Sequence, residues 1–428
     1  MNKKTTGLLF LVFLTTLAYS QGSLSATERK VLASVDRQMP QTIALLKESV
    51  DINSGTFNIE GVKKVGAIYR RQLEALGFTT EWVAMPGSMG RAGHLVAWRK
   101  GTKGKKLLLI GHLDTVFEPS MPAGPFTILN DSTASGQGVN DMKGGDVMII
   151  AALKALDENN LLKDASITVY FTGDEENAGD PKEVSRGDFI RRGKASDVAL
   201  AFETATNMNT VATARRGSST WELKVESKQA HSSGLFGSAG FGSVYEAARI
   251  INTFREQLQE PYLTFNPGLF AGGSNVEGHE GKFEVQGKSN IIAPKAIVAG
   301  DLRFLSEQQK QTARRKMRAI VDSSLRGTKA SITFMDGIPS MPPTGGNQAL
   351  ADKLNKLSLE MGLGIVQAGN PGSRGAGDIS YTAEFTDCLD GLGASGTGAH
   401  APGETINLKQ FPSLIKRTAL FINRLIND

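Results

Sequence analysis

Two glutamates stand side by side in the segment VYFTGDEENAGD, residues 169–180, where Glu175 and Glu176 follow a run of β-favouring residues. Adjacent like charges repel each other, although the pair also fits a solvated turn without any function. Similar polar residues follow other strand-like runs of the chain: His112, Asp114, Asp141, Glu203 and His400. Two histidines and several carboxylates are a suitable ligand set for a divalent metal ion of borderline-to-hard character.

Each of these residues also has a structural interpretation when it is considered alone. Asp141, in GVNDMKGG, stands at a loop-to-helix junction, where an aspartate commonly caps the helix. His112 and Asp114 are two residues apart in LLLIGHLDTVF, so they share one face of an extended segment. There Asp114 would accept a hydrogen bond from the second ring N–H of His112 and fix the tautomer of the imidazole.

The elements that must position these residues have the pattern of an α/β fold. Near-continuous apolar runs in KKLLLIGHLD, ASITVYFTGDEE and SDVALAFET read as strands buried on both faces. They alternate with helical segments such as GGDVMIIAALKALDENN, which indicates a largely parallel sheet flanked by helices. Ligands of such sheets collect beyond the carboxyl ends of the strands. We therefore expect the candidate ligands to meet at one edge of the sheet.

The pattern changes near Trp221, where half-exposed strands such as WELKVES alternate with amphipathic helices. This indicates an α+β unit with helices on one face of a mostly antiparallel sheet. After IPSMPPTGG the first pattern returns. The sequence therefore predicts a discontinuous α/β domain over residues 21–216 and 338–428. An α+β unit over residues 217–337, called the insert from here on, interrupts it.

Composition limits the class of protein. A chain of 428 residues with 40% apolar and 21% charged residues suggests two globular domains. The single cysteine, Cys388, excludes an intramolecular disulfide and a thiolate metal cluster. The net charge of +5 is mild and compatible with acidic substrates. No block of Lys and Arg with interleaved aromatics occurs, so nucleic acid is not an expected partner.

The N-terminal residues have the pattern of a secretory signal. Lys3 and Lys4 precede an apolar stretch from Leu8 to Ala18, and small residues follow. The stretch is short for a membrane span, which needs roughly 20 residues. We expect residues 1–20 to be removed and the mature protein to be periplasmic or secreted from a bacterium, without a membrane anchor.

The motifs GHLDTV, GVNDMKGG, DEE, ET and GAHAPGE occur in this order. In this the chain resembles the dinuclear zinc family of carboxypeptidase G, succinyl-diaminopimelate desuccinylase and aminoacylase, over nearly all of its mature length. The resemblance implies two zinc ions, with cobalt or manganese as substitutes, and a ferredoxin-like insert that serves as lid or dimerisation domain. It implies that Asp141 bridges the metals, that His112 and Glu203 complete one site, and that Glu176 and His400 complete the other. Glu175 would be the general base for a water between the metals.

The same resemblance suggests roles for residues outside the metal site. His231, in SKQAHSSG, matches a histidine of the insert that stabilises the oxyanion, often across a dimer interface. Ser227 replaces the usual glycine of that motif, and a surface histidine is the alternative. Asn290 in SNIIAP, Arg303 in GDLRF and Arg374 in GSRGAGD are candidates to bind a substrate carboxylate. For Arg303 the alternative is a structural ion pair with Asp301 or a helix carboxylate.

The function implied is an exported hydrolase of an amide bond next to a free carboxylate, in a small peptide or acyl-amino acid. A glutamate carboxypeptidase-like enzyme fits best, because Glu203 stands where aminopeptidase-like relatives often have aspartate. A dipeptidase or N-acyl-amino-acid amidohydrolase is the alternative. An inactive relative that only binds metal or peptide is more remote, since all six expected positions of the metal site are occupied.

Overall fold

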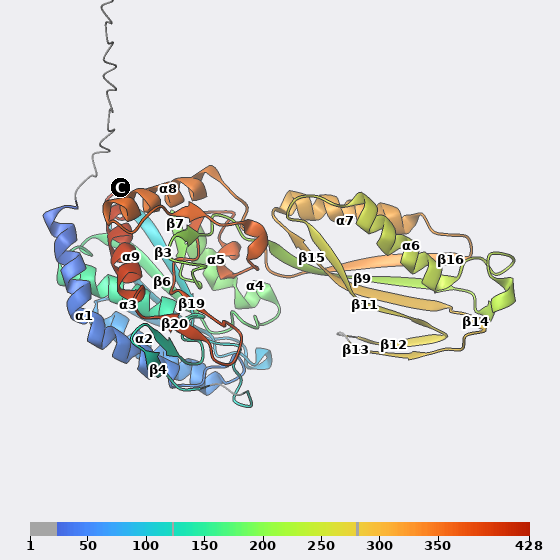
Figure 1. Ribbon diagram of the computed structural model, residues 1–428, viewed down its shortest axis with the longest axis horizontal. Coiled ribbons are helices and arrows are strands. Elements are labelled where there is room, and N and C mark those ends of the chain that lie inside the picture. The colour runs from blue at the N-terminus through green and yellow to red at the C-terminus, as the bar shows by residue number, and fades with distance from the viewer. Residues whose placement is uncertain (1–23, 122–123, 280–281) are drawn as a thin grey trace, which may run out of the picture.

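The computed structural model describes residues 24–121, 124–279 and 282–428, and it consists of two lobes (Figure 1). The larger lobe contains both ends of the described chain, and the smaller lobe is the insert. The predicted signal segment, residues 1–20, lies outside the described residues. Among the helices that are described, none has the length and apolar character needed to span a bilayer.

A six-stranded sheet forms the centre of the larger lobe, in the order β1-β2-β6-β3-β7-β18. Strands β6, β3, β7 and β18 are parallel. At one side β2 pairs antiparallel with β6 and β1 pairs antiparallel with β2, so only β2 runs in the opposite direction. The bounds are β1 Thr79–Val83, β2 His94–Arg99, β3 Lys103–His112, β6 Ala165–Thr172, β7 Val198–Ala201 and β18 Asp387–Leu389. The mixed, largely parallel α/β sheet expected from the sequence is therefore confirmed.

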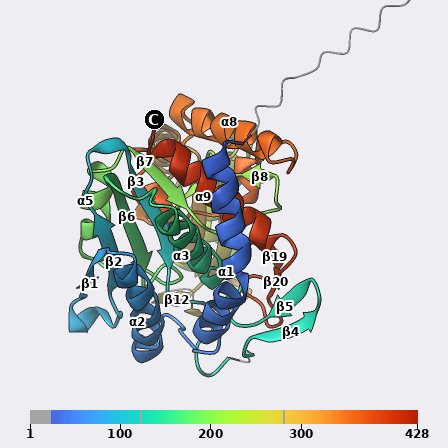
Figure 2. The ribbon, with the colours of Figure 1, turned by 90° about the vertical axis from the view of Figure 1, so that its left-hand side faces the viewer.

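Helices cover both faces of this sheet. On one face α1 (Ala26–Val50), α3 (Lys143–Glu158) and α9 (Phe411–Leu425) pack side by side (Figure 2). In β3, Leu107 and Leu109 belong to the core on that face, whereas Leu108 and Ile110 belong to the core that contains Phe189 of α5 (Gly187–Lys194). Burial of β3 on both faces explains its unbroken apolar run.

Shorter elements complete this lobe. Helices α2 (Ile59–Ala75) and α8 (Gly345–Glu360) pack beside β2 and β18, and α4 spans Lys182–Ser185. A four-stranded sheet has the order β19-β20-β5-β4, with bounds Gly396–Thr397, Thr405–Asn407, Thr133–Ser135 and Thr127–Asn130. A parallel pair joins β8 (Thr210–Val211) and β17 (Gln367–Ala368). Helix α1 begins with a capping box between Ser25 and Glu28, which satisfies free N–H groups of its first turn.

The insert contains a four-stranded antiparallel sheet in the order β11-β15-β9-β16. Its elements follow one another as β9 (Gly217–Ser227), α6 (Gly242–Gln257), β11 (Thr264–Gly273), β15 (Lys295–Phe304), α7 (Glu307–Asp322) and β16 (Thr328–Asp336). This βαββαβ succession with the first and third strands in the centre is a ferredoxin-like arrangement. Both helices pack on one face, over a core that includes Trp221, Leu223 and Phe254.

Two small additions extend the insert. Strands β12 (Asn275–His279) and β13 (Lys282–Gln286) form a hairpin that the sequence did not reveal, and it lies away from the helices (Figure 1). Strand β10 (Ala230–His231) pairs with β14 (Ile291–Ile292) at the end of the insert farthest from the larger lobe. At the opposite end the two connections between the lobes run together, because Ser218 exchanges main-chain hydrogen bonds with Gly337 and Ile338.

Candidate metal centre

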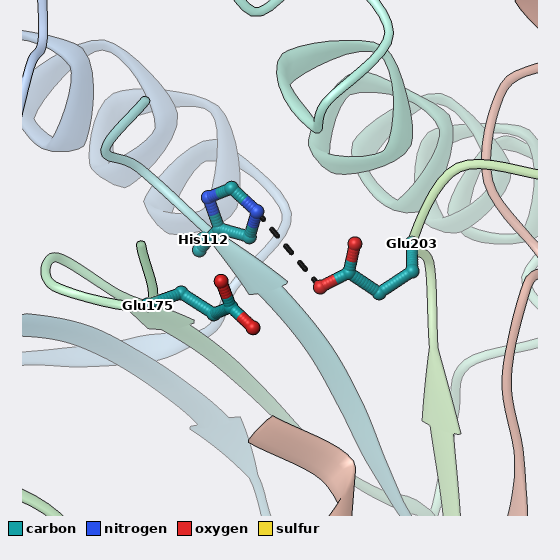
Figure 3. A group of neighbouring side chains, drawn as sticks. All are labelled: His112, Glu175 and Glu203. Carbon is teal, nitrogen blue, oxygen red and sulfur yellow. Dashed lines mark ion pairs between the residues drawn. The ribbon is translucent and has the colours of Figure 1, made fainter. Parts of the chain in front are cut away.

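The candidate ligands come from segments that meet at one edge of the large sheet. His112 is the last residue of β3, and Glu175 and Glu203 follow β6 and β7, the strands on either side of β3. Figure 3 shows these three side chains pointing toward one another. Asp141 lies two residues before the start of α3, and His400 lies between β19 and β20. The parallel strands thus deliver their polar ends to one place, as the sequence predicted.

Asp141 lies between the two histidines. Its Oδ1 is 3.4 Å from Nε2 of His112, and its Oδ2 is 3.1 Å from Nε2 of His400. Glu203 approaches the first histidine at 3.8 Å, and Glu176 approaches the second at 3.2 Å. Two groups of one histidine and one glutamate therefore share one aspartate, which is the division that the sequence motifs implied.

The donor groups fit divalent metal ions. In the part of the chain that the structure describes, Nε2 of His112 and Oε1 of Glu176 are buried without a hydrogen-bond partner. An unsatisfied buried acceptor costs free energy, and a bound cation would remove this cost. Nδ1 of His112 lies 3.0 Å from the main-chain oxygen of Asp114, so a proton on Nδ1 leaves Nε2 free to coordinate.

Burial and mutual repulsion also shift the pKa values of the carboxyl groups in this site. Burial raises the pKa of Glu203 to about 7. Burial and the charge of Glu203 raise the pKa of Glu175 well above its ordinary value. Burial alone would also raise the pKa of Asp141, but His112 and His400 face its carboxylate and lower it. Positive charge placed among these groups would favour their ionised forms.

Glu175 is half-buried on the same side as His112 and Glu203. Donor atoms of these three residues lie within 4.8 Å of one another, and Glu175 lines the pocket beside them. This position suits a base that reaches a water molecule next to the metals. The same position would also allow Glu175 to coordinate a metal ion itself. The role of Glu175 as base rather than ligand therefore stays a prediction.

The carboxylate of Asp114 contacts both the glutamate pair and His112. Its two oxygens accept the consecutive main-chain N–H groups of Glu175 at 3.0 Å and Glu176 at 3.1 Å. Thr56 Oγ1 donates to the same carboxylate at 2.6 Å. The carboxylate also lies 3.5 Å from Nδ1 of His112, the contact expected from the sequence, and the main-chain oxygen of Asp114 is closer to the same nitrogen, at 3.0 Å. Anchoring of both N–H groups lets the two adjacent glutamate side chains point to different groups of the site.

Two further anchors of the site were not recognised from the sequence. Glu404 accepts main-chain N–H groups of the loop that carries Asp141, although it stands at the end of the quoted motif GAHAPGE. Arg186 is completely buried and forms ion pairs with Asp174 at 2.6 Å and Asp378 at 2.9 Å. Asp174 directly precedes the glutamate pair in the chain. The sequence offers no signal for Arg186, because its partners are brought to it only by the fold.

A pocket of about 360 Å³ opens beside the site. Arg374 lines it, and its Nη1 donates to the main-chain oxygen of Thr204 at 2.8 Å. No side-chain hydrogen bond of Nη2 or Nε of Arg374 occurs within the described ranges, so this edge of the guanidinium is available to a ligand. Arg215 supports the same loop by donating to the main-chain oxygens of Gly375 and Ala376.

The candidate residues of the insert lie elsewhere. His231 is exposed on β10 with Nδ1 2.9 Å from Ser233 Oγ, and Asn290 is exposed next to it. Both are at the far end of the insert, and neither lines the pocket. Arg303 is near the other end of β15, where its Nε lies 2.7 Å from Asp301, the structural pairing that the sequence left open. Within one chain the structure does not bring these three residues to the metal centre.

The fold and the site together define a two-domain metal-dependent hydrolase. The model of the protein family described as "Peptidase family M20/M25/M40" matches residues 108–424, and this chain belongs to that family of metallopeptidases. The family resemblance stated from the motifs is therefore confirmed.

Individual relatives agree with this assignment. The chain is 28% identical to carboxypeptidase G2 from a Pseudomonas species over 404 residues, which cover 92% of this chain and 91% of the relative. It is 25% identical to the succinyl-diaminopimelate desuccinylase of Cupriavidus pinatubonensis over 344 residues, which cover 76% and 84%. The crystal structure of the aminopeptidase PepT from Bacillus cereus has a TM-score of 0.70 and 16% identity, with 90% and 98% coverage. This last likeness concerns the fold.

Proposed function

We propose that this protein is an exported carboxypeptidase that uses two divalent metal ions, and that these are zinc. The observation that carries the proposal is the position of Asp141, with one oxygen toward His112 and the other toward His400. Glu203 and Glu176 would complete the two sites. Imidazole and carboxylate ligands suit zinc, and cobalt or manganese would substitute.

The residues of this chain then divide the work of hydrolysis. Two divalent ions in these sites supply a water of lowered pKa and polarise the scissile carbonyl. Glu175 takes the proton of the attacking water and delivers it to the leaving amine. Asp114 keeps Glu175 and Glu176 in place through their main-chain N–H groups.

Recognition of the substrate carboxylate is assigned to Arg374, because it lines the pocket, its Nε and Nη2 have no hydrogen bond to a described residue, and a guanidinium matches a carboxylate in geometry. A preference for a C-terminal glutamate or a similar residue is supported by the similarity to carboxypeptidase G2 over most of both chains. Hydrolysis of an N-acyl-amino acid is the second candidate, since a desuccinylase is also among the relatives.

A homodimer through the insert would complete the site. His231 and Asn290 are exposed at the far end of the insert and reach no metal ligand of their own chain. A second copy would bring them to the pocket, where His231 would stabilise the oxyanion of the tetrahedral intermediate.

A panel of substrates tests this function. The mature protein, residues 21–428, is loaded with zinc and incubated with N-acyl-glutamates, other N-acyl-amino acids and dipeptides, and the products are identified by mass. We expect release of the C-terminal residue, loss of activity with a chelator and recovery with zinc. Activity that survives complete metal removal, or none after reconstitution, would contradict the proposal.

Export is tested separately. Expression of the full chain in a bacterium, followed by fractionation and N-terminal sequencing, should give a periplasmic or secreted protein that begins near residue 21. A protein that stays in the cytoplasm with Met1 intact would exclude the proposed signal.

A further inference from the structure

Glu404 is buried at the contact between two loops of the metal centre. It is 1% exposed and lies four residues after His400, just before β20. Its Oε2 accepts the N–H of Gly138 at 2.8 Å. Its Oε1 accepts the N–H groups of Asn140 and Asp141, both at 2.7 Å. Three main-chain donors of one turn thus converge on a single side chain that is 263 to 266 residues away in sequence.

The main chain strengthens the same connection. The oxygen of Glu404 accepts the N–H of Gly136 at 3.1 Å. Within its own loop, the N–H of Glu404 donates to Ala401, and the N–H of Ala401 donates to Gly398. Gly398 and Gly403 have φ values of 78° and 87°, which glycine adopts without strain, so the loop can turn tightly around His400.

A carboxylate is required by this geometry. Both oxygens act as acceptors, and no Lys or Arg of the described chain forms an ion pair with Glu404. The carboxylate is therefore held by main-chain N–H groups, as anions are in turns that present several donors. A glutamine would have to turn an NH₂ group toward at least one of these donors.

We propose that Glu404 is a positioning residue that ties the loop of Asp141 to the loop of His400 and so fixes the separation of the two metal sites. The proposal rests on the proposed two-metal function, because each joined loop carries one of the expected ligands. Asp141 presents its two oxygens to different histidines only if its main chain is held in one orientation. Glu404 supplies three of the contacts that hold it.

Metal affinity of Glu404→Gln tests this role. Zinc affinity is measured by competition with a chromogenic chelator, and the geometry is followed by the absorption spectrum of the cobalt-loaded protein. Loss of a group that orients a metal ligand typically weakens metal binding by about 10- to 100-fold. We expect a loss of this size for at least one of the two ions and a changed cobalt spectrum.

Glu246→Gln is the matched control. Glu246 is also a completely buried glutamate that accepts a main-chain N–H, that of Leu325, but it lies in the insert. We expect it to lose stability without any change of metal affinity or cobalt spectrum. A folded Glu404→Gln protein with both properties unchanged would overturn the proposal.

Hydrogen exchange of the wild-type protein gives a test that needs no variant. In the metal-free protein the amides of Asn140 and Asp141 should be protected at least as well as those of the neighbouring sheet ends. Exchange as fast as in an exposed loop would show that Glu404 does not hold these two amides. If the wild-type protein binds no metal, the proposed function fails, while protected amides would still show that Glu404 holds the two loops.

Discussion

The edge of the large sheet and the far end of the insert differ in how their candidate residues are held. At the sheet edge, His112, Asp141 and Glu203 are mostly or completely buried, and hydrogen bonds fix the main chain beside them. At the far end of the insert, His231 and Asn290 are exposed; Nδ1 of His231 contacts Ser233, and the main-chain oxygen of Asn290 accepts the N–H of Ser232. A metal site must be preorganised within one domain, whereas residues that meet it only in an assembly can remain exposed on the surface.

The largest effect should come from Glu175→Gln. Loss of a general base typically lowers turnover by about 10²- to 10⁴-fold. We expect this decrease in kcat while elemental analysis still finds two metal ions per chain. Glu183→Gln, on the exposed helix α4, serves as the control and should change neither value. Loss of metal from Glu175→Gln would make this residue a ligand.

His231→Ala tests whether the insert contributes to the site in an assembly. Removal of one oxyanion donor typically costs about 10²- to 10³-fold in kcat. We expect this loss without loss of metal. Mixed dimers of His231→Ala with Glu175→Gln chains should regain activity, because each chain would supply what the other lacks. No recovery in verified mixed dimers, or an unchanged kcat of the single variant, would remove His231 from the site.

A pair of arginine variants compares the two regions directly. A hydrogen bond to a charged group contributes about 1.5–3 kcal/mol, so Arg374→Ala should raise KM by roughly 10- to 150-fold for a substrate with a free carboxylate. Amidation of the substrate carboxylate should abolish the difference in KM between Arg374→Ala and the wild-type protein. Arg303→Ala should leave KM nearly unchanged, because Arg303 binds Asp301. The opposite pattern would assign the binding of the substrate carboxylate to Arg303 of the insert.

The smallest effect is expected for an ion pair of the insert whose carboxylate, Asp336, is exposed and whose arginine, Arg314, is buried. Asp336 lies 2.5 Å from Arg314 and is 62% exposed in its side chain. Although burial alone would raise it, the pKa of Asp336 is lowered because Arg314 and Lys310 donate to its carboxylate. Asp336→Asn should cost less than about 1 kcal/mol in urea unfolding.

The contribution of this ion pair should also depend on pH. Because the folded pKa is the lower one, the contribution is present above the unfolded pKa of about 3.9 and is lost as the pH falls through the folded value. Unfolding of both proteins at pH 7 and near pH 3 measures this. A loss that is large and independent of pH would show that the pair is shielded from solvent.

The sequence predicted the central strands β3, β6 and β7 of the large sheet and the residues at their ends because these signals are local. Leu107 to Ile110 form an apolar run that must be buried on both faces, and His112 follows at its carboxyl end. The sequence motifs also implied the pairs His112–Glu203 and His400–Glu176, whose side chains lie 3.8 Å and 3.2 Å apart in the structure. The metals themselves and the roles of these residues remain predictions.

The contacts that hold the main chain and the ligands of the site in place could not be predicted in the same way. Arg186 and Asp378 are 192 residues apart, and nothing in either segment indicates that they form a buried ion pair. The expected contact of the Asp114 carboxylate with His112 is present at 3.5 Å, but its hydrogen bonds with the main-chain N–H groups of Glu175 and Glu176 were not predicted. Such contacts depend on loop conformations that the sequence pattern does not specify.

The most direct test of the central claim is a crystal structure of the zinc-loaded protein with anomalous scattering measured at the zinc edge. We predict two peaks about 3.5–4 Å apart, one on each side of the Asp141 carboxylate. One peak should lie beside His112 and Glu203, and the other beside His400 and Glu176. A single peak, or zinc positions that Asp141 does not bridge, would contradict the account.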